Sequence, residues 1–237
     1  MLVGVRIIAG SLGSRRLEAP PGLATRPTSD RLRETLFNVL APRIEGAAFL
    51  DLYAGSGAVG MEALSRGAAQ VEFVERGPAA LKVLRGNLER LGIAAGFHIH
   101  AVAVGAFLRK GHAASGNAGD TESHPDRKSY KKQVLRLRCA PLRMTAAREG
   151  HPAGKRERYE VVFLDPPWDA AEEYAATLGL LGGSAAGLLG AGALVIAEHR
   201  RKQLLEDRYG LLERTRLLEQ GDAALSFYAA SRDLARE

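Results

Sequence analysis

Cysteine is nearly absent from this chain, which contains only Cys139 among its 237 residues. A single cysteine excludes an intramolecular disulfide and leaves no cysteine cluster for a structural zinc ion. Disulfides are common in secreted proteins and rare in reducing compartments, so this composition is typical of an intracellular protein. We therefore expect a cytoplasmic protein that binds no metal.

The sequence also lacks a convincing membrane segment. An apolar run from Leu2 to Ile8 is short, is interrupted by Arg6 and is not followed by the core or cleavage site of a signal peptide. The stretch from Tyr174 to Ala197 is uncharged over a length that would span a bilayer, but it contains six glycines, each of which weakens a helix by about 1 kcal/mol. We expect a helix, a glycine-rich turn and a buried strand there, and no membrane partner.

Positive charge is concentrated in one segment. The chain has a formal net charge of +6, whereas residues 109–158 hold 13 Lys and Arg against 5 Asp and Glu, a net of +8, so the rest of the chain nets −2. This indicates a polyanionic partner, although a solvated basic loop explains it about as well. The segment is too polar and too long for an ordinary connection, and we predict a flexible insertion over residues 109–158.

The hydrophobic pattern predicts a single α/β domain over residues 1–237. A hydrophobic content of 46% is enough for one sizeable core. Residues 1–24 are expected to form a small β extension, followed by a helix that is capped by Thr28 or Ser29 and ends at Ala41-Pro42. Strands and helices alternate beyond it, which implies right-handed crossovers and a doubly wound, mostly parallel sheet.

Seven strands are expected in this sheet, and the last two form an antiparallel hairpin around Gly221-Asp222. The expected strands are 49–53, 71–75, 97–102, 159–164, 193–198, 211–218 and 224–228, and the helices between them are 59–65, 78–91 and 171–181.

A glycine loop follows the first of these strands. Gly55, Gly57 and Gly60 match the G-x-G-x-x-G pattern, which lets a backbone approach a nucleotide cofactor closely. Glu75, at the end of the next strand, suits ribose hydroxyls, but a dinucleotide-binding fold has an acid there as well. Asp51 precedes the loop and favours a cationic ligand such as S-adenosylmethionine, because it would repel a pyrophosphate. A nicotinamide dinucleotide, or a purely structural role for both acids, remains the alternative.

The most specific motif is Asp165-Pro166-Pro167-Trp168, which follows an apolar strand and so lies at its carboxyl end. Exocyclic amines of bases are weak nucleophiles, because the nitrogen lone pair is delocalised into the ring. Asp165 and the Pro166 carbonyl can accept the two N–H bonds of such an amine and aim its lone pair at a methyl group. Trp168 offers a face for a base turned out of its stack. The alternative is a strand-ending proline pair with a core tryptophan.

These signals together resemble the class I methyltransferase fold. The segment from Thr25 to Asn38 further resembles a bacterial family that methylates N2 of a single guanine in 16S ribosomal RNA. Other matching segments lie across most of the chain outside residues 109–158, namely Arg6–Gly10, Asp51–Ala68, Val74-Glu75, Phe163–Trp168 and Leu225–Tyr228. The resemblance implies S-adenosyl-L-methionine as cofactor and 16S ribosomal RNA, free or within an assembled small-subunit particle, as substrate of a monomeric enzyme.

Site residues follow from the motifs and from this resemblance. The catalytic group is Asp165, Pro166, Pro167 and Trp168. Cofactor contacts are expected from Arg26, Thr28, Asp51, Tyr53, Gly55, Gly57 and Glu75. RNA contacts are expected from Arg6, Arg15, Arg16, Arg31, Lys131 and Lys132. The family usually has an aspartate after the third strand that contacts the adenine amine, and here Ala103 and its neighbours leave that contact missing.

Other functions fit the same motifs. An adenine-N6 or cytosine-N4 methyltransferase acting on RNA or DNA is the main alternative, because Asp-Pro-Pro followed by an aromatic residue serves those amines equally well. A catalytically weak, RNA-binding relative is a second alternative. A dinucleotide oxidoreductase has only the glycine loop in its favour.

Overall fold

The computed structural model describes residues 5–19, 29–113 and 158–230, which belong to one compact unit. Four predicted site residues lie outside these ranges: Arg26, Thr28, Lys131 and Lys132. Most of the predicted insertion also lies outside them. The exceptions are its first residues, where Arg109 and Lys110 lie in a helix that continues to Ala113, and its last residue, Arg158.

The elements alternate along the chain as the hydrophobic pattern predicts. The helices are α1 (Asp30–Ile44), α2 (Ala58–Ser65), α3 (Pro78–Leu91), α4 (Val104–Ala113) and α5 (Ala171–Leu181), with a short 3₁₀ turn, η2 (Ala186–Leu188). The strands are β1 (Ala48–Leu52), β2 (Gln70–Val74), β3 (Phe97–His100), β4 (Tyr159–Leu164), β5 (Leu189–Arg200), β6 (Arg208–Tyr209), β7 (Leu212–Gln220) and β8 (Ala223–Ala230).

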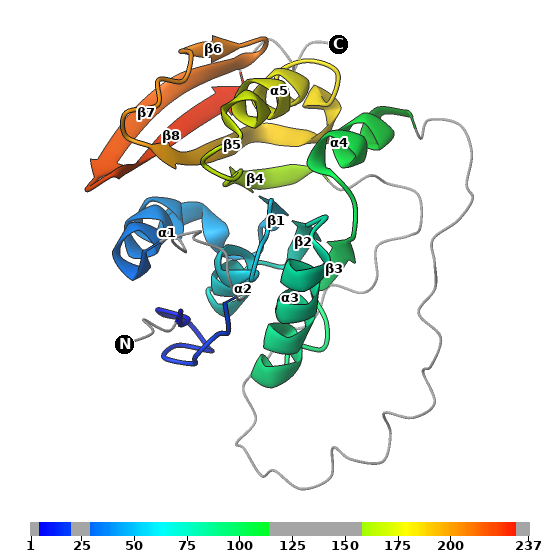
Figure 1. The fold of residues 1–237 in the computed structure, drawn as a ribbon, viewed down its shortest axis with the longest axis vertical. Helices are drawn as coiled ribbons and strands as arrows, with labels where there is room; N and C mark the ends of the chain where they lie inside the picture. Colours follow the sequence, from blue (N-terminus) through cyan, green and yellow to red (C-terminus); the bar gives the residue numbers. More distant parts are fainter. Residues whose placement is uncertain (1–4, 20–28, 114–157, 231–237) are drawn as a thin grey trace, which may run out of the picture. The chain divides into compact units, whose positions relative to one another are not determined.

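Within the described residues these strands form one sheet in the order β3-β2-β1-β4-β5-β8-β7-β6 (Figure 1). Strands β1 to β5 pair in parallel, and β8 then pairs antiparallel with β5 and with β7. The mostly parallel α/β fold class and the terminal hairpin are confirmed. The sheet has eight strands rather than seven, because the two-residue β6, too short to give a periodic signal, adds to the edge of β7.

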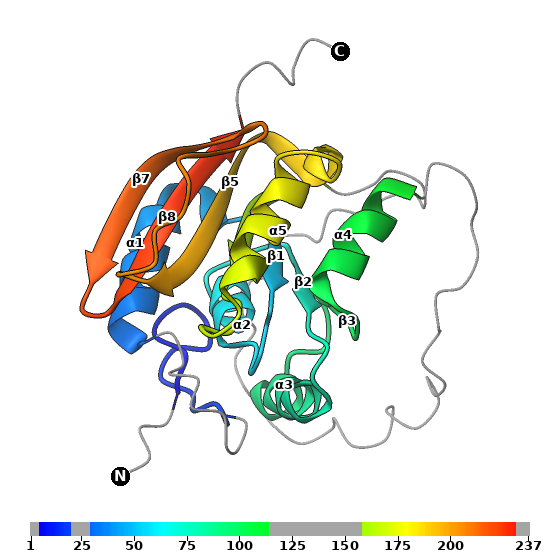
Figure 2. The same ribbon diagram turned by 45° about the horizontal axis from the view of Figure 1, so that its top comes forward.

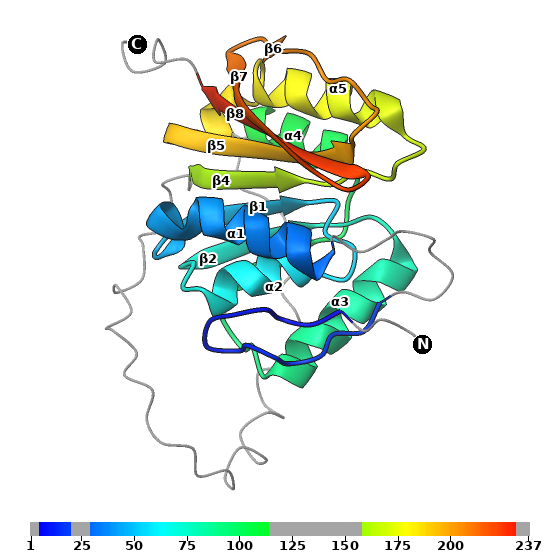
Figure 3. The same cartoon turned by 90° about the vertical axis from the view of Figure 1, so that its left-hand side faces the viewer.

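Helices cover both faces of the sheet. One core joins α1, α2 and α3 to side chains such as Phe49, Phe163 and Ile196, and a second core joins α4 and α5 to the alternate residues of the same strands. Figure 3 shows α1 and α2 in front of the sheet, and Figure 2 shows α4 and α5 on the other side. The face of the sheet that packs against α1, α2 and α3 is called the α1 face below.

Helix α1 extends further than predicted. Its N-terminus is capped by Ser29, whose hydroxyl accepts the Leu32 N–H at 3.2 Å, as expected. The predicted end at Ala41-Pro42 is wrong, since the helix continues to Ile44 with Pro42 inside it. Proline removes only one helical hydrogen bond near this end, and continuing the turn buries Ile44 in the core.

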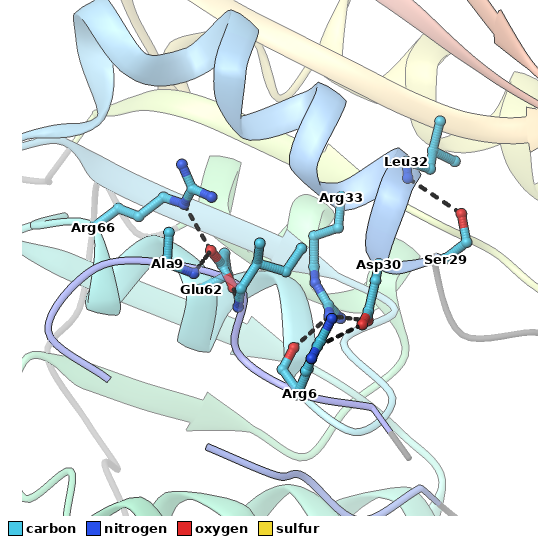
Figure 4. Close-up of polar contacts among 9 residues, drawn as sticks. Arg6, Ala9, Ser29, Asp30, Leu32, Arg33, Glu62 and Arg66 are labelled. Carbon is cyan, nitrogen blue, oxygen red and sulfur yellow. Dashed lines mark hydrogen bonds and ion pairs between the residues drawn. The ribbon is translucent and has the colours of Figure 1, made fainter. Parts of the chain in front are cut away.

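The N-terminal β extension is a hairpin-like element held by buried charges. Arg6 and Arg16 form an antiparallel bridge, and the Ile7 N–H donates to the Arg15 carbonyl at 2.9 Å. Glu62 on α2 is fully buried and accepts the backbone N–H groups of Ile8 at 2.6 Å and Ala9 at 3.0 Å (Figure 4). One carboxylate thus fixes the hairpin to the α1 face of the sheet.

The uncharged stretch from Tyr174 to Ala197 folds as predicted into the end of α5, the η2 turn and most of β5. Among the described residues, no helix combines the length and apolarity that crossing a membrane requires. Strand β5 is longer than predicted, because Leu189 to Gly192 and the residues after Glu198 also join the sheet.

Candidate active site at the carboxyl edge of the sheet

Three acidic residues lie on the α1 face where β1, β4 and β5 end. Side chains alternate between the two faces of a strand, so Asp51 lies on the same face as Phe49, Asp165 on that of Phe163, and Glu198 on that of Ile196. These three apolar residues belong to the core under α1. The parallel pairing of β1, β4 and β5 brings the acids to one edge. Two of the three were predicted as site residues, and Glu198 was not.

Asp51 is buried and holds the start of α2. Its Oδ2 atom accepts the Gly60 N–H at 2.9 Å, and its side chain is only 2% exposed. Burial raises its pKa from 3.8 to about 7, the Gly60 hydrogen bond opposes this rise, and the charge of Glu75 adds to it. A cation placed beside this buried carboxyl would stabilise its ionised form.

Glu75 ties the glycine loop to the start of α3. Its Oε2 accepts the Gly55 N–H at 2.9 Å and its Oε1 accepts the Gly77 N–H at 2.6 Å. Each carboxylate oxygen has a further lone pair and can accept a second hydrogen bond. Glu75 is partly exposed, so it can still receive two hydroxyl groups from a ligand.

The three loop glycines are required for different reasons. Gly57 has φ +78°, and a Cβ there would lie 2.2 Å from Leu84 Cδ1. A Cβ on Gly60 would lie 2.3 Å from Phe73 Cε1. Around Gly55, by contrast, a Cβ would meet nothing closer than 3.9 Å, and its φ of +56° is what favours glycine there. Packing therefore accounts for Gly57 and Gly60, and only Gly55 borders open space; cofactor contact by Gly57 stays a prediction.

Tyr53 connects the loop to α5. It adopts a left-handed backbone with φ 61°, and its hydroxyl donates to Glu173 Oε2 at 2.8 Å while lying 2.7 Å from Thr177 Oγ1. Burial, with further contributions from Glu173, raises the pKa of Tyr53 even though the Thr177 hydrogen bond lowers it. The hydroxyl is therefore committed to α5, and only the ring and the backbone can face a cofactor.

The Asp165–Trp168 motif follows β4 directly. Asp165 is partly exposed, and its removal from bulk water, followed by the negative charges of Glu198 and Asp51, raises its pKa well above the ordinary value. Tyr174 of α5 is fully buried; its hydroxyl donates to the Glu198 carbonyl at 2.9 Å and lies 3.4 Å from the Pro166 carbonyl. This hydroxyl fixes the ends of β4 and β5 relative to each other.

Trp168 has one face covered by an arginine. The guanidinium carbon of Arg200, the last residue of β5, lies 4.9 Å from the centre of the indole ring. Such a contact is a cation–π interaction and holds the ring in a defined orientation. A base that stacks on Trp168 must therefore use the opposite face. The sequence motif gave no sign of Arg200.

A buried arginine, Arg33, lies on α1, and Figure 4 shows its guanidinium next to Asp30 and Arg6. Its Nη2 donates to the Arg6 carbonyl at 2.5 Å and to Asp30 Oδ1 at 2.9 Å, whereas its Nε and Nη1 have no hydrogen-bond partner. Burial lowers its pKa, and the charges of Asp30, Glu62 and Glu198 oppose that shift. Its helical spacing from Leu36, Phe37 and Leu40, which are all buried, was the available signal in the sequence.

The described basic residues that were predicted to contact RNA lie at the surface. Arg6 is 60% exposed and pairs with Asp30 at 3.0 Å, while the exposed Arg15 donates to the Leu91 carbonyl at 3.1 Å. Arg16 and Arg31 are exposed as well. The first turn of α1 lies near Glu198. Its last turn lies near the start of β5, where Arg43 donates to the Gly192 carbonyl. Arg6 and Arg31, which lie in or beside the first turn, are therefore at the same edge of the sheet as Asp165.

Ala103, where the resemblance implies a missing adenine contact, directly precedes α4, and its carbonyl accepts the Phe107 N–H at 3.0 Å. Within residues 5–19, 29–113 and 158–230, no group of three or more His, Cys, Asp and Glu side chains could hold a metal ion.

Known proteins resemble this chain over all or part of its length. It is 30% identical over 225 residues to "Putative rRNA methyltransferase YlbH" of Bacillus subtilis, covering 94% of this chain and 98% of that protein. It is 51% identical over 87 residues to "Ribosomal RNA small subunit methyltransferase D" of Escherichia coli, but that match spans 37% of this chain and 44% of the relative.

Solved structures include a methyltransferase candidate that matches the fold of this chain. The fold matches "Putative methyltransferase yhhF from Escherichia coli" with a TM-score of 0.69 and 28% identity, covering 97% of this chain and 99% of that one. An RNA methyltransferase candidate from Pyrococcus horikoshii, at 16% identity and a TM-score of 0.58, shares the fold alone.

A sequence family described as "Conserved hypothetical protein 95" matches residues 5–117 and 127–229. The match includes most of the basic segment 109–158, which the resemblance of motifs did not cover. Within that segment, only residues 118–126 lie outside the match. With the sheet order, the motif positions and this coverage in agreement, the chain belongs to the family described as Conserved hypothetical protein 95 and has the class I methyltransferase fold.

Proposed function

We propose that this protein transfers a methyl group from S-adenosyl-L-methionine to the exocyclic N2 amine of a guanine in 16S ribosomal RNA. The observation that carries the proposal is the position of Asp165, at the end of β4 and on the same face as Asp51, next to the glycine loop. The names of the Bacillus and Escherichia relatives support ribosomal RNA as the substrate.

The cofactor part of the site fits S-adenosylmethionine. That molecule supplies a methyl group bound to positively charged sulfur, and it also carries an ammonium group and two ribose hydroxyls. Asp51 suits the ammonium, Glu75 suits the hydroxyls, and the open space at Gly55 lets the backbone approach the ligand. A pyrophosphate would instead face Asp51, Glu75 and Asp165, which disfavours a dinucleotide. Contacts from Arg26, Thr28 and the ring of Tyr53 complete the proposed set.

The base part of the site holds the amine. Asp165 accepts one N–H bond of the amine, and the Pro166 carbonyl, which lies 3.4 Å from the Tyr174 hydroxyl, accepts the other. The rigid Pro166-Pro167 pair fixes the direction of this carbonyl. Trp168 stacks on the base with the ring face that Arg200 leaves open.

The test of this function is a map of methylated nucleotides. We expect mass spectrometry of 16S RNA to find one N2-methylguanine in cells that contain the protein, to lose it when the gene is deleted and to regain it when the gene is restored. The same assay on naked RNA and on small-subunit particles separates the two substrates. Loss of an N6-methyladenine or N4-methylcytosine instead, or of no mark at all, would support one of the alternative functions.

We further propose that a monomer acts in the cytoplasm and contacts RNA phosphates through Arg6, Arg15, Arg16, Arg31, Lys131 and Lys132. Each phosphate contact contributes a slope of about −0.7 to a plot of log K against log salt for single-stranded RNA. Arg16→Ala should flatten this slope by about 0.7. Arg43→Ala, at the opposite edge of the sheet, removes the same charge and should leave the slope unchanged. Equal slopes for both variants and the wild type in filter binding would show that Arg16 contacts no RNA phosphate.

A further inference from the structure

Glu198 lies next to the proposed amine site and has no role in the function proposed above. Leu164 of β4 pairs with Ala197 of β5, so the residues that follow, Asp165 and Glu198, are neighbours across two parallel strands. Both lie on the α1 face of the sheet, and Glu198 is only 2% exposed. The Tyr174 hydroxyl bridges the backbone at the two strand ends and keeps these positions in register.

A second carboxylate beside the first distinguishes guanine from the other bases with exocyclic amines. In guanine the ring nitrogen next to the amine, N1, carries a hydrogen, so amine and ring present two adjacent donors. In adenine N1 and in cytosine N3 the corresponding ring nitrogen has no hydrogen and is an acceptor. An ionised carboxylate is an acceptor only. Two neighbouring carboxylates therefore match guanine and oppose adenine and cytosine.

We propose that Glu198 is the specificity-determining residue of this site, whose carboxylate accepts the N1–H of the target guanine while Asp165 holds the N2 amine. This inference rests on the function proposed above and names the residue that selects its base. It also explains how the site would select guanine over adenine and cytosine, since the Asp-Pro-Pro motif alone serves the amines of all three bases.

Two neighbouring acidic side chains repel each other, and Arg33 supplies a positive charge on the same face. Its guanidinium is fully buried on α1, and the negative charge of Glu198 acts on it across the face that both share. A positive charge on this face offsets part of the repulsion between the two neighbouring acids. A charged residue in an otherwise apolar helix stripe is costly, and balancing the acids at the strand ends gives this arginine a role.

The test compares two RNA substrates that differ at the target base. 2-Aminopurine keeps the 2-amino group of guanine, but its N1 has no hydrogen. We expect the wild-type protein to favour guanine over 2-aminopurine by about 10- to 100-fold in kcat/KM, the range for a hydrogen bond to a charged group. Glu198→Gln presents either a carbonyl or an N–H to N1, and we expect the preference to fall to a few-fold. Glu219→Gln, an exposed acid on β7, is the matched control and should keep the wild-type ratio.

Each outcome bears on the proposal. A wild-type protein that methylates both RNAs at equal rates overturns it, whether or not the variant folds. A Glu198→Gln protein that slows both substrates by one common factor also overturns it, because a structural role predicts that result. Calorimetry with S-adenosylhomocysteine should give the same affinity for wild type and variant. If the wild-type protein methylates only adenine or cytosine RNA, the proposed function itself fails, and that failure is visible without any variant.

Discussion

Replacing Asp165 with asparagine should lower kcat by about 10²–10³-fold, the usual cost of removing one preorganised polar contact at a reacting group. Asparagine has nearly the same shape, but it lacks the charge that polarises the amine. Cofactor affinity should change little, because Asp51, Gly55 and Glu75 are untouched. Single-turnover rates and calorimetry with S-adenosylhomocysteine measure the two effects separately.

Asp169→Asn is the matched control for this substitution, because Asp169 is exposed and lies in the same loop. It should retain the wild-type rate. The pH profile gives a second measurement: the pKa of Asp165 is raised, so the wild-type rate should climb as pH rises and the carboxyl ionises, whereas the asparagine variant should lose this dependence. Near-full activity of Asp165→Asn would exclude the proposal that the Asp165 carboxylate holds the amine.

Replacing Asp51 with asparagine should weaken cofactor binding by about 10- to 100-fold at pH 8, the range for a hydrogen bond to a charged group. Because the pKa of Asp51 is about 7, the wild-type carboxyl is largely protonated at pH 6 and ionised at pH 8. Wild-type affinity should therefore rise across this interval, while the affinity of the variant stays flat. Calorimetric titrations at pH 6, 7 and 8 test both statements, and parallel curves would contradict them.

The same substitution should have the opposite effect on stability. The folded pKa of Asp51 lies above its ordinary value of 3.8, so the folded chain holds this proton more tightly than the unfolded chain. Ionisation therefore costs folding free energy as pH rises from about 4 to about 7. Asp51→Asn removes that cost, and its unfolding midpoint should exceed that of the wild type at pH 8 but not at pH 4. A variant that is less stable than the wild type at pH 8 would mean that the Gly60 contact outweighs the charge.

Sequence periodicity located the regular elements that have strong local signals. Helix α3 is predicted to the residue, because Pro78 begins it and Gly92, with φ +71°, ends it. Strand β4 is bounded as clearly by its apolar run and the prolines that follow. By contrast, β6 has only two residues and forms only because β7 lies beside it.

The predicted site is incomplete for a different reason. Asp51, Glu75 and Asp165 stand in motifs that can be read along the chain. Glu198 gains its meaning only from the register of β5 against β4, and Arg200 only from its position over Trp168. Neither relation is encoded in a short segment of sequence, since both depend on how distant strands pair.

The strand order also sets a schedule for folding during synthesis. Strand β1 pairs with β2 on one side and with β4 on the other, and residues 114–157 separate β4 from everything before it. At typical rates of synthesis these residues take roughly 2–9 seconds to emerge from a ribosome. For that interval β1 has one edge without its partner, and unpaired parallel edges invite association with other chains. The length of this segment therefore sets how long that edge of the nascent protein needs protection.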